Sequence, residues 1–231
     1  MMALLPLLVF GHSVYAAANG EDVCDDPVKP PRQLIIDATA DLLSTAKTAQ
    51  SYFDQDPERY YREIEKMVDK LVDTERFTRG VMATYASARL YRTLESEAEK
   101  AQFSTRIKRF SEVLKRTLVE TYAQALLNAD GEHIETLPSD DESNDSRYAR
   151  VDQKIYDSTE TPHQVQYSLR HKPCEPWKLY NVIIDGVNIG NIFRNQFASS
   201  VEKHKGNVDL AIDNWSSEQN SVAIPKDEQA L

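Results

Sequence analysis

The chain has 231 residues, of which 41% are hydrophobic and 28% charged, a composition that supports one folded domain and not a disordered chain. Thirty-seven acidic against 27 basic residues give a net charge of −10, which argues against a nucleic-acid partner. The seven glycines form no GxGxxG or GxxxxGK[ST] motif, and the two cysteines and five histidines show no zinc-ligand spacing, so we expect neither a nucleotide cofactor nor a metal.

The N-terminus predicts a secretory signal peptide. Residues 1–10 are apolar, whereas a membrane-spanning helix needs about 20 such residues. Ala16 and Ala18 fit an A-x-A cleavage pattern, which makes residues 1–18 the signal peptide and residues 19–27 a mature N-terminal extension. A buried N-terminal helix is the alternative, because no Lys or Arg precedes the apolar run.

Cys24 and Cys174 would then lie in an oxidising compartment, where a disulfide between them could form. Such a bridge closes a loop of roughly 150 residues, for which the chain-entropy model gives an upper figure of about 5 kcal/mol. Two free thiols are the alternative.

The first half of the mature chain carries apolar residues at helical spacing. We predict helices over 28–53, over 56–71 with Asp56 as the N-cap, and over about 73–85. The longest periodic stretch predicts a helix over about 96–128, roughly 50 Å in length.

The pattern then changes to the period-two alternation of β-strands. After a polar acidic loop at 138–146, strands are predicted at 147–157, 162–172 and 177–185. A tight Asp-Gly turn leads to a short fourth strand at 187–191.

Two further helices are predicted near the C-terminus, before a flexible tail. Helices followed by antiparallel strands predict an α+β fold in a single domain. Its parts are a helical region at 28–130, a sheet of about four strands at 147–191, C-terminal helices at 192–204 and 206–215, and the tail at 216–231.

Two groups of residues allow more than one interpretation. Five basic residues on the predicted long helix form either its solvated face or a docking patch for an acidic partner or a phosphate: Arg106, Lys108, Arg109, Lys115 and Arg116. The apolar strand faces form either a simple core or an acyl-chain pocket, and composition does not separate the two. No GxSxG nucleophile or Cys–His pairing indicates an enzyme.

Four segments carry a resemblance to a known family. They read WKLYNVIIDGVNI at 177–189, FRNQF at 193–197, DTERFTRGVMATY at 73–85 and FSEVLKRTLVETYAQALL at 110–127. Together they resemble the MlaC family, also called the toluene-tolerance (Ttg) family, and the similarity extends over about 28–215. The chain departs from the family's usual Asp, Ser, Gly and Tyr at four positions, Asn181, Asn188, Ala83 and Phe193, which weakens roles for these side chains.

The resemblance implies a monomeric, non-enzymatic carrier of diacyl phospholipid in the periplasm. Such carriers move lipid between an MlaA-like outer-membrane lipoprotein complex and the MlaD-like ring of an inner-membrane ABC transporter, and so maintain outer-membrane lipid asymmetry. Exposing two acyl chains of about 16 carbons to water costs roughly 25 kcal/mol at about 0.8 kcal/mol per CH₂. The implied fold therefore wraps the helical half around a curved sheet and encloses an apolar lipid pocket.

The face pattern of the predicted elements assigns residues to this pocket. We expect its lining to consist of Val81, Tyr85, Leu114, Leu118, Tyr122, Val165, Tyr167, Leu169, Val182, Ile184, Val187 and Ile189. Arg194 is expected either to pair with an acid inside the fold or to reach a lipid phosphate. Alternative functions are an α+β-cup small-ligand-binding protein or enzyme in the periplasm, and a chaperone or scaffold that uses the long helix.

Overall fold

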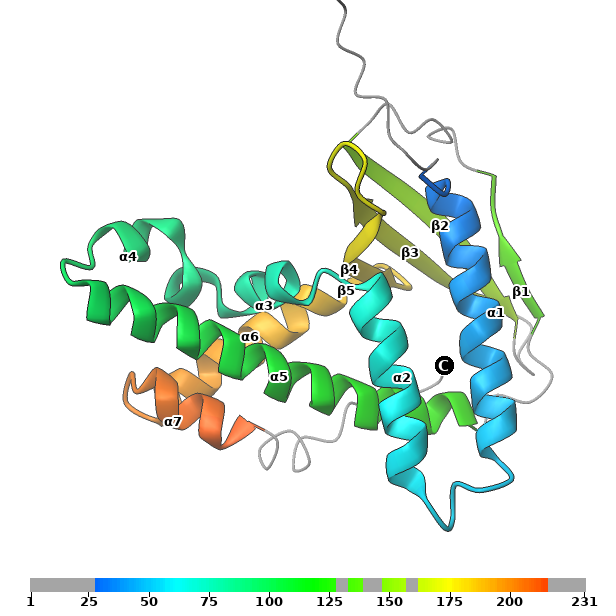
Figure 1. Ribbon diagram of the computed structural model, residues 1–231, viewed down its shortest axis with the longest axis horizontal. Coiled ribbons are helices and arrows are strands. Elements are labelled where there is room, and N and C mark those ends of the chain that lie inside the picture. Colours follow the sequence, from blue (N-terminus) through cyan, green and yellow to red (C-terminus); the bar gives the residue numbers. More distant parts are fainter. Residues whose placement is uncertain (1–27, 128–132, 139–146, 157–161, 216–231) are drawn as a thin grey trace, which may run out of the picture.

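The computed structural model describes residues 28–127, 133–138, 147–156 and 162–215 (Figure 1). The predicted signal peptide, the N-terminal extension with Cys24, and the C-terminal tail lie outside these residues. Within them, no helix is both long enough and apolar enough to span a membrane.

The helical half precedes the sheet, as the sequence predicts. It comprises α1 (Pro31–Ala49), α2 (Pro57–Leu71), α3 (Thr74–Met82), the 3₁₀ turn η1 (Ala83–Ala86), α4 (Ala88–Arg92) and α5 (Glu97–Leu127). Proline occupies the first turn of α1 and of α2, and the side chains of Asp56 and Asp73 cap α2 and α3 by accepting the N–H groups of Arg59 and Arg76. The third helix ends at Met82, so Tyr85 lies in the 3₁₀ turn and not in α3.

The sheet has five antiparallel strands in sequential order, and the predicted α+β fold is confirmed. The strands are β1 (His133–Thr136), β2 (Tyr148–Tyr156), β3 (His163–Arg170), β4 (Lys178–Ile184) and β5 (Val187–Asn188). Sequence reasoning expected about four strands and missed β1, because its four residues, HIET, contain only one large apolar side chain.

A β-bulge interrupts the pairing of β3 with β4. Ser168 pairs with Asn181 but Leu169 pairs with Leu179, which leaves Tyr180 as the extra residue. Strict alternation predicts that Leu179 and Val182 face opposite sides. The bulge instead places both side chains on one face of the sheet, the face on which their β3 partners, Leu169 and Tyr167, lie.

Two helices complete the fold, α6 (Ile189–Lys203) and α7 (Val208–Asp213). The side chain of Asn188 accepts the N–H group of Asn191, so the helix begins earlier than predicted. Ile189, expected in the middle of the short fourth strand, is therefore the first residue of α6.

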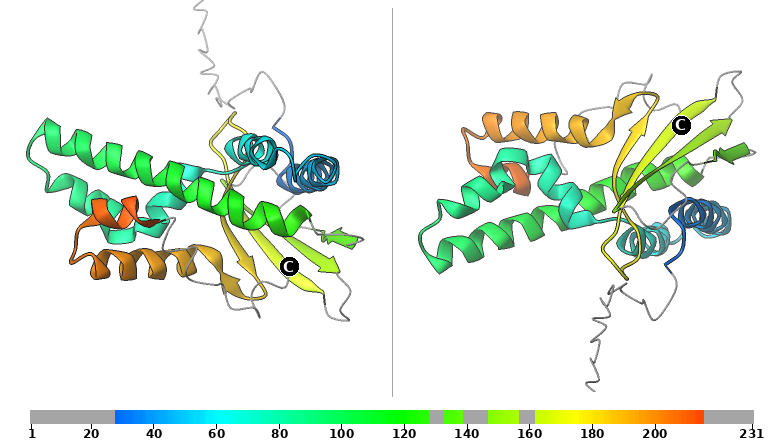
Figure 2. Two further views of the ribbon diagram at one scale, coloured as in Figure 1. Left: turned by 90° about the horizontal axis from the view of Figure 1, so that it is seen from below. Right: turned by 90° about the horizontal axis from the view of Figure 1, so that it is seen from above.

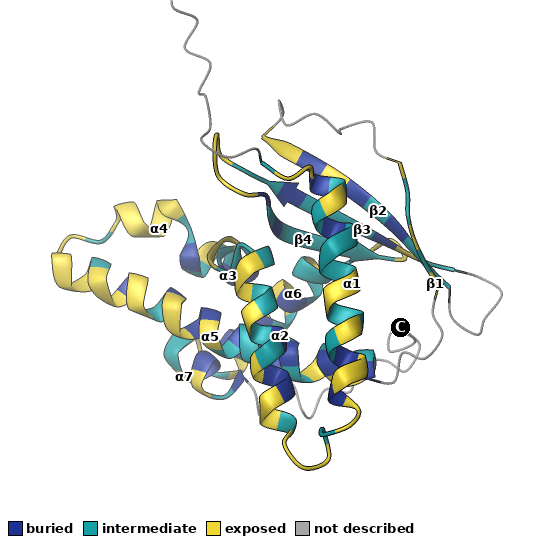
Figure 3. Cartoon of the chain, turned by 45° about the vertical axis from the view of Figure 1, so that its right-hand side comes forward, coloured by how far each residue is buried: buried dark blue, intermediate teal, exposed yellow. Residues whose placement is uncertain are grey.

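The long helix α5 connects a cluster formed with α3, α6 and α7 to the region of α1 and α2 (Figures 1 and 2). Its first half joins α3, α6 and α7 in a helical cluster that includes Phe110, Phe197 and Trp215. Its second half packs against α1 and α2 around Tyr60 and Val119. Figure 3 shows α4 and the start of α5 largely exposed, whereas α1 and α2 bury the faces that they turn toward the rest of the fold.

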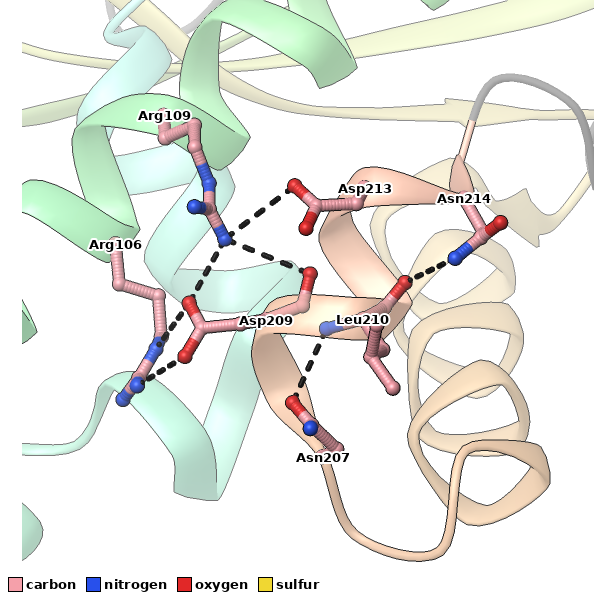
Figure 4. A network of polar contacts seen from close by, with 7 residues as sticks. All are labelled: Arg106, Arg109, Asn207, Asp209, Leu210, Asp213 and Asn214. Carbon is pink, nitrogen blue, oxygen red and sulfur yellow. Dashed lines mark hydrogen bonds and ion pairs between the residues drawn. The ribbon is translucent and has the colours of Figure 1, made fainter.

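Four of the five basic residues of α5 form intramolecular ion pairs. Arg106 donates to both carboxylate oxygens of Asp209 at 3.0 and 2.6 Å, and Arg109 donates to Asp209 Oδ1 at 2.8 Å, which fastens α7 to α5 (Figure 4). Arg116 reaches Glu58 on α2 at 2.7 Å, and Lys115 also pairs with α2. Lys108 is exposed.

A single side chain joins the start of α1 to the end of β1. Arg32 donates from Nη2 to the carbonyl of Thr136 at 2.8 Å and from Nε to the carbonyl of Leu137 at 3.0 Å. Helix α1 is thereby held along the side of the sheet where β1 lies.

Candidate functional site: an apolar cavity between helices and sheet

A cavity of about 420 Å³ lies between the sheet and the helices. Its volume falls in the range of typical ligand sites, which is about 300–1,000 Å³. Its wall consists of residues from α1, α2, α3, α5, α6 and four strands, and aliphatic and aromatic side chains predominate in it.

Helix α5 supplies one wall. Leu114, Leu118 and Tyr122 recur every fourth residue and so share one face of the helix, next to Val119 and Ala123. Leu114 is fully buried, whereas Leu118 and Tyr122 are half-buried although they lie in the interior. Their remaining exposure reflects the hollow that they face.

The sheet supplies the opposite wall. Val165 pairs with Ile184 and Tyr167 with Val182, so these four side chains lie on the same face of the sheet. Gln153 lies opposite Val165 and extends this face onto β2. All five residues line the cavity.

Eight of the twelve residues expected to form a pocket lie in this wall. They are Leu114, Leu118, Tyr122, Val165, Tyr167, Val182, Ile184 and Ile189.

The other four lie elsewhere, each for a local reason. Val81 is buried in the helical cluster and Tyr85 packs there against Phe197. Leu169 lies beyond the bulge and is buried with Trp177. Val187 follows the Asp-Gly turn and is 37% exposed.

Part of the wall was not predicted as a site. The additional residues include Thr39, Leu42 and Leu43 on α1, Ile64 and Val68 on α2, and Ile134 on β1. The apolar stripe of α2 includes Ile64 and Val68 and could have identified them as buried. Their spacing does not distinguish a cavity wall from a solid core. No sequence signal marks Ile134.

A buried polar network lies in the apolar wall. Gln153 is 2% exposed, and its Nε2 donates to Thr39 Oγ1 at 3.1 Å and to Thr136 Oγ1 at 2.9 Å. Its Oε1 accepts the hydroxyl of Tyr167 at 2.9 Å, and burial raises the pKa of Tyr167 to about 12. Because these groups bond to one another, the surface that they contribute to the cavity is compatible with hydrocarbon.

One charged side chain, Lys115, occurs among the described residues of the wall. Its Nζ lies 3.0 Å from Asp69 Oδ1 and 3.1 Å from Glu112 Oε2. Burial disfavours the ammonium form, but the hydrogen bonds to the two carboxylates outweigh this effect and raise its pKa. The aliphatic part of the side chain can therefore line the cavity while the ammonium group stays paired.

Two other expectations concern residues outside the cavity wall. Arg194 Nε donates to the carbonyl of Gly80 at 2.9 Å and so joins α6 to α3. Cys174, between β3 and β4, takes part in a disulfide bond, whereas Cys24 lies outside the described residues.

The cavity favours binding of an apolar ligand. Within the described ranges, no three His, Cys, Asp or Glu side chains gather as a metal site. The wall joins residues of five helices and four strands around a hollow whose polar groups are mostly paired, which suits a chain of methylene groups.

Comparisons with known proteins agree with this geometry. Residues 37–217 match the family model described as MlaC protein. Toluene tolerance protein ttg2D of Pseudomonas putida is 28% identical over 188 residues, which cover 81% of this chain and 80% of that protein. The solved structure of the phospholipid-binding protein from Ralstonia solanacearum, in complex with a phospholipid, has a TM-score of 0.66 at 20% identity, over 84% of this chain and 98% of that one. The last comparison shows a shared fold.

Proposed function

Because this chain belongs to the MlaC family, we propose that it is a phospholipid carrier whose cavity holds the acyl tails of a diacyl lipid. The observation that carries the proposal is the apolar cavity of about 420 Å³ between α5 and the sheet. The similarity to the Pseudomonas toluene tolerance protein and to the Ralstonia phospholipid-binding protein supports it.

The carrier acts by burial and not by catalysis. Each methylene group moved from water into the cavity contributes about 0.8 kcal/mol, so the tails supply most of the binding free energy. We further propose that it works as a monomer in the periplasm. There it would pass lipid between an MlaA-like outer-membrane complex and the MlaD-like ring of an ABC transporter, and so preserve outer-membrane lipid asymmetry.

The test places a charge in the cavity wall. In Leu118→Asp or Val182→Glu, a carboxylate replaces an apolar side chain in contact with the tails, and hydrocarbon cannot solvate it. We expect both variants to fold, as judged by circular dichroism, and to purify without lipid, as judged by native mass spectrometry.

Leu210→Asp is the matched control, because Leu210 is 45% exposed on α7 and does not line the cavity. It should retain lipid like the unmodified protein. Lipid retained at normal levels by Leu118→Asp would contradict the proposal. A bound small metabolite would favour the small-ligand-binding or enzymatic alternative, and a higher-order mass without ligand would favour a scaffold.

A further inference from the structure

The volume of the cavity determines how much hydrocarbon it can hold. An engineered apolar cavity of about 150 Å³ binds benzene, so such a site provides roughly 25 Å³ for each of the six carbon atoms. At that ratio, the cavity of about 420 Å³ holds about 17 carbon atoms. This is the size of one acyl chain of a membrane phospholipid, which has about 16 carbons.

A second acyl chain exceeds this capacity. Two chains with about 32 carbons together need roughly 800 Å³ at the same ratio, nearly twice the volume present. The wall gains little space from side-chain movement, because its buried members are packed on their other sides as well. Leu114 belongs to the helical cluster, and Val119 and Ala123 pack against α1 and α2. A second chain therefore requires the walls to move apart.

Hydrogen bonds hold the walls at their present separation. Gln153 Nε2 donates to Thr39 Oγ1 at 3.1 Å and so joins β2 to α1. The main-chain N–H of Asp73 donates to the carbonyl of Leu179 at 2.7 Å and so joins the start of α3 to β4. Gln153, Thr39 and Leu179 all line the cavity. Widening the hollow for a second chain works against these contacts, whereas a single chain leaves them intact.

Resting on the proposed function, we propose that the cavity also binds single-chain phospholipids, the lysophospholipids, one per protein and without separation of its walls. The single acyl chain fills the hollow, and the head group needs no burial. Each methylene group that enters the cavity raises the affinity about fourfold. A diacyl phospholipid needs space for its second chain in addition, so the two classes of lipid differ in what they require of the fold.

Native mass spectrometry counts the bound chains directly. Delipidated protein is mixed with an excess of palmitoyl-lysophosphatidylcholine, kept below the concentration at which micelles form. We expect saturation at one lipid per protein. Palmitate in a parallel arm tests a fatty acid as the source of the chain, and it should also saturate at one. Two chains per protein in either arm would overturn the proposal.

A series of chain lengths locates the limit of the cavity. Lysophosphatidylcholines with saturated chains of increasing length compete for a limiting amount of protein. Each added methylene should raise the bound fraction about fourfold up to about 17 carbons, and longer chains should gain nothing, because the extra groups stay in water. A gain that continues unchanged to about 20 carbons would contradict a cavity for one chain of this size.

Substitutions at Leu118, which lines the cavity and is half-buried, should move this limit in both directions. Leu118→Phe adds about three carbon atoms to the wall and should lower the limit to about 14 carbons, whereas Leu118→Ala removes about three and should raise it to about 20. Leu210→Phe is the matched control, because Leu210 is 45% exposed on α7 and outside the wall, and its limit should not change. Should Leu118→Phe fail to fold, Leu118→Ala decides. A limit that is the same in all variants overturns the proposal.

Uptake of dioleoyl-phosphatidylcholine from vesicles, measured alongside, separates this inference from the proposed function. Protein that takes up the diacyl lipid but no lysophospholipid overturns the single-chain site alone. Protein that binds one lysophospholipid but never the diacyl lipid overturns the carrier function and leaves the single-chain site. Protein that binds neither lipid overturns both.

Discussion

Gln153 is tolerated in an apolar wall because each of its side-chain polar atoms has a partner. Its amide binds the hydroxyls of Thr39, Thr136 and Tyr167, which come from α1, β1 and β3. An unpaired amide at 2% exposure would cost about 1–3 kcal/mol. The network therefore fixes one helix and three strands relative to one another around the cavity.

Tyr167 should make the protein sensitive to alkali. Its pKa is raised to about 12 by burial, against about 10 in the unfolded chain, so the unfolded state loses the proton first. Its stabilising contribution is complete below pH 10 and is lost as pH rises toward 12. Urea unfolding at pH 9 and pH 11 should show a smaller loss of stability in Tyr167→Phe than in the unmodified protein.

Tyr52 and Tyr60 also have pKa values near 12, chiefly through burial, so part of the alkaline loss should remain in that variant. Tyr156→Phe is the control for loss of a tyrosine hydroxyl, because the hydroxyl of Tyr156 contacts Glu135 at the surface. An identical pH dependence in Tyr167→Phe would show that Tyr167 ionises as readily in the fold as in water.

At the scale of elements, the start of α6 packs closely on β4. A Cβ atom built on Gly190 would lie 2.9 Å from Asn181 Oδ1 and 3.3 Å from Asn188 Oδ1. Asn188 is the N-cap of α6 and Asn181 lines the cavity. Glycine at position 190 thus lets the helix begin beside the cavity wall.

We expect Gly190→Ala to lower the free energy of unfolding by about 1 kcal/mol, because the methyl group displaces the capping side chain. Gly80→Ala should instead raise it by about 0.5–1 kcal/mol, since Gly80 lies within α3 with no atom near its added Cβ. Urea denaturation measures both. The same sign of change in the two variants would contradict a close contact at Gly190.

A helix or strand could be predicted from the sequence only where a local residue pattern determines it. The apolar spacing of α5 repeats over many turns, and the helix predicted over 96–128 spans Glu97–Leu127. β1 has too few residues to show a period. The start of α6 depends on the side chain of Asn188, which accepts the N–H group of Asn191, and hydrophobic alternation does not indicate such a cap. The bulge at Tyr180 changes the face of β4 residues without any glycine or proline to mark it.

The same limit applies to the cavity wall. Val165, Tyr167, Val182 and Ile184 follow from period-two alternation because they pair in regular register. Leu169 obeys the same alternation, yet Trp177 and Ile35 fill the space beside it. Whether a face meets a solid core or a hollow depends on packing between distant segments, which no local period encodes.

At the scale of the whole molecule, one helix divides a solid region from a hollow one. The first half of α5 packs Phe103, Ile107 and Phe110 among buried side chains of α3, α6 and α7. The second half borders about 420 Å³ that protein atoms leave unfilled. Lining atoms of such a cavity lack contacts that a ligand can provide.

Lipid should therefore stabilise the fold as it fills the cavity. A ligand at about 100 times its Kd adds about 2.7 kcal/mol, which for a protein of this size raises Tm by about 5–10 °C. Thermal unfolding of delipidated protein with increasing phospholipid should show this rise. Leu118→Asp should show none, and a Tm of the unmodified protein that is independent of lipid would contradict binding in the cavity.

Arg32 also affects whether two copies of the chain can associate by pairing strands at β1. β1 is the first strand of the sheet, and an outer strand with free carbonyls is a template on which a neighbouring molecule can add its own strand. The guanidinium of Arg32 already occupies the carbonyls of Thr136 and Leu137 and places a positive charge there. A strand added at this end of β1 would have to displace Arg32, which disfavours growth of a continuous sheet from one molecule to the next.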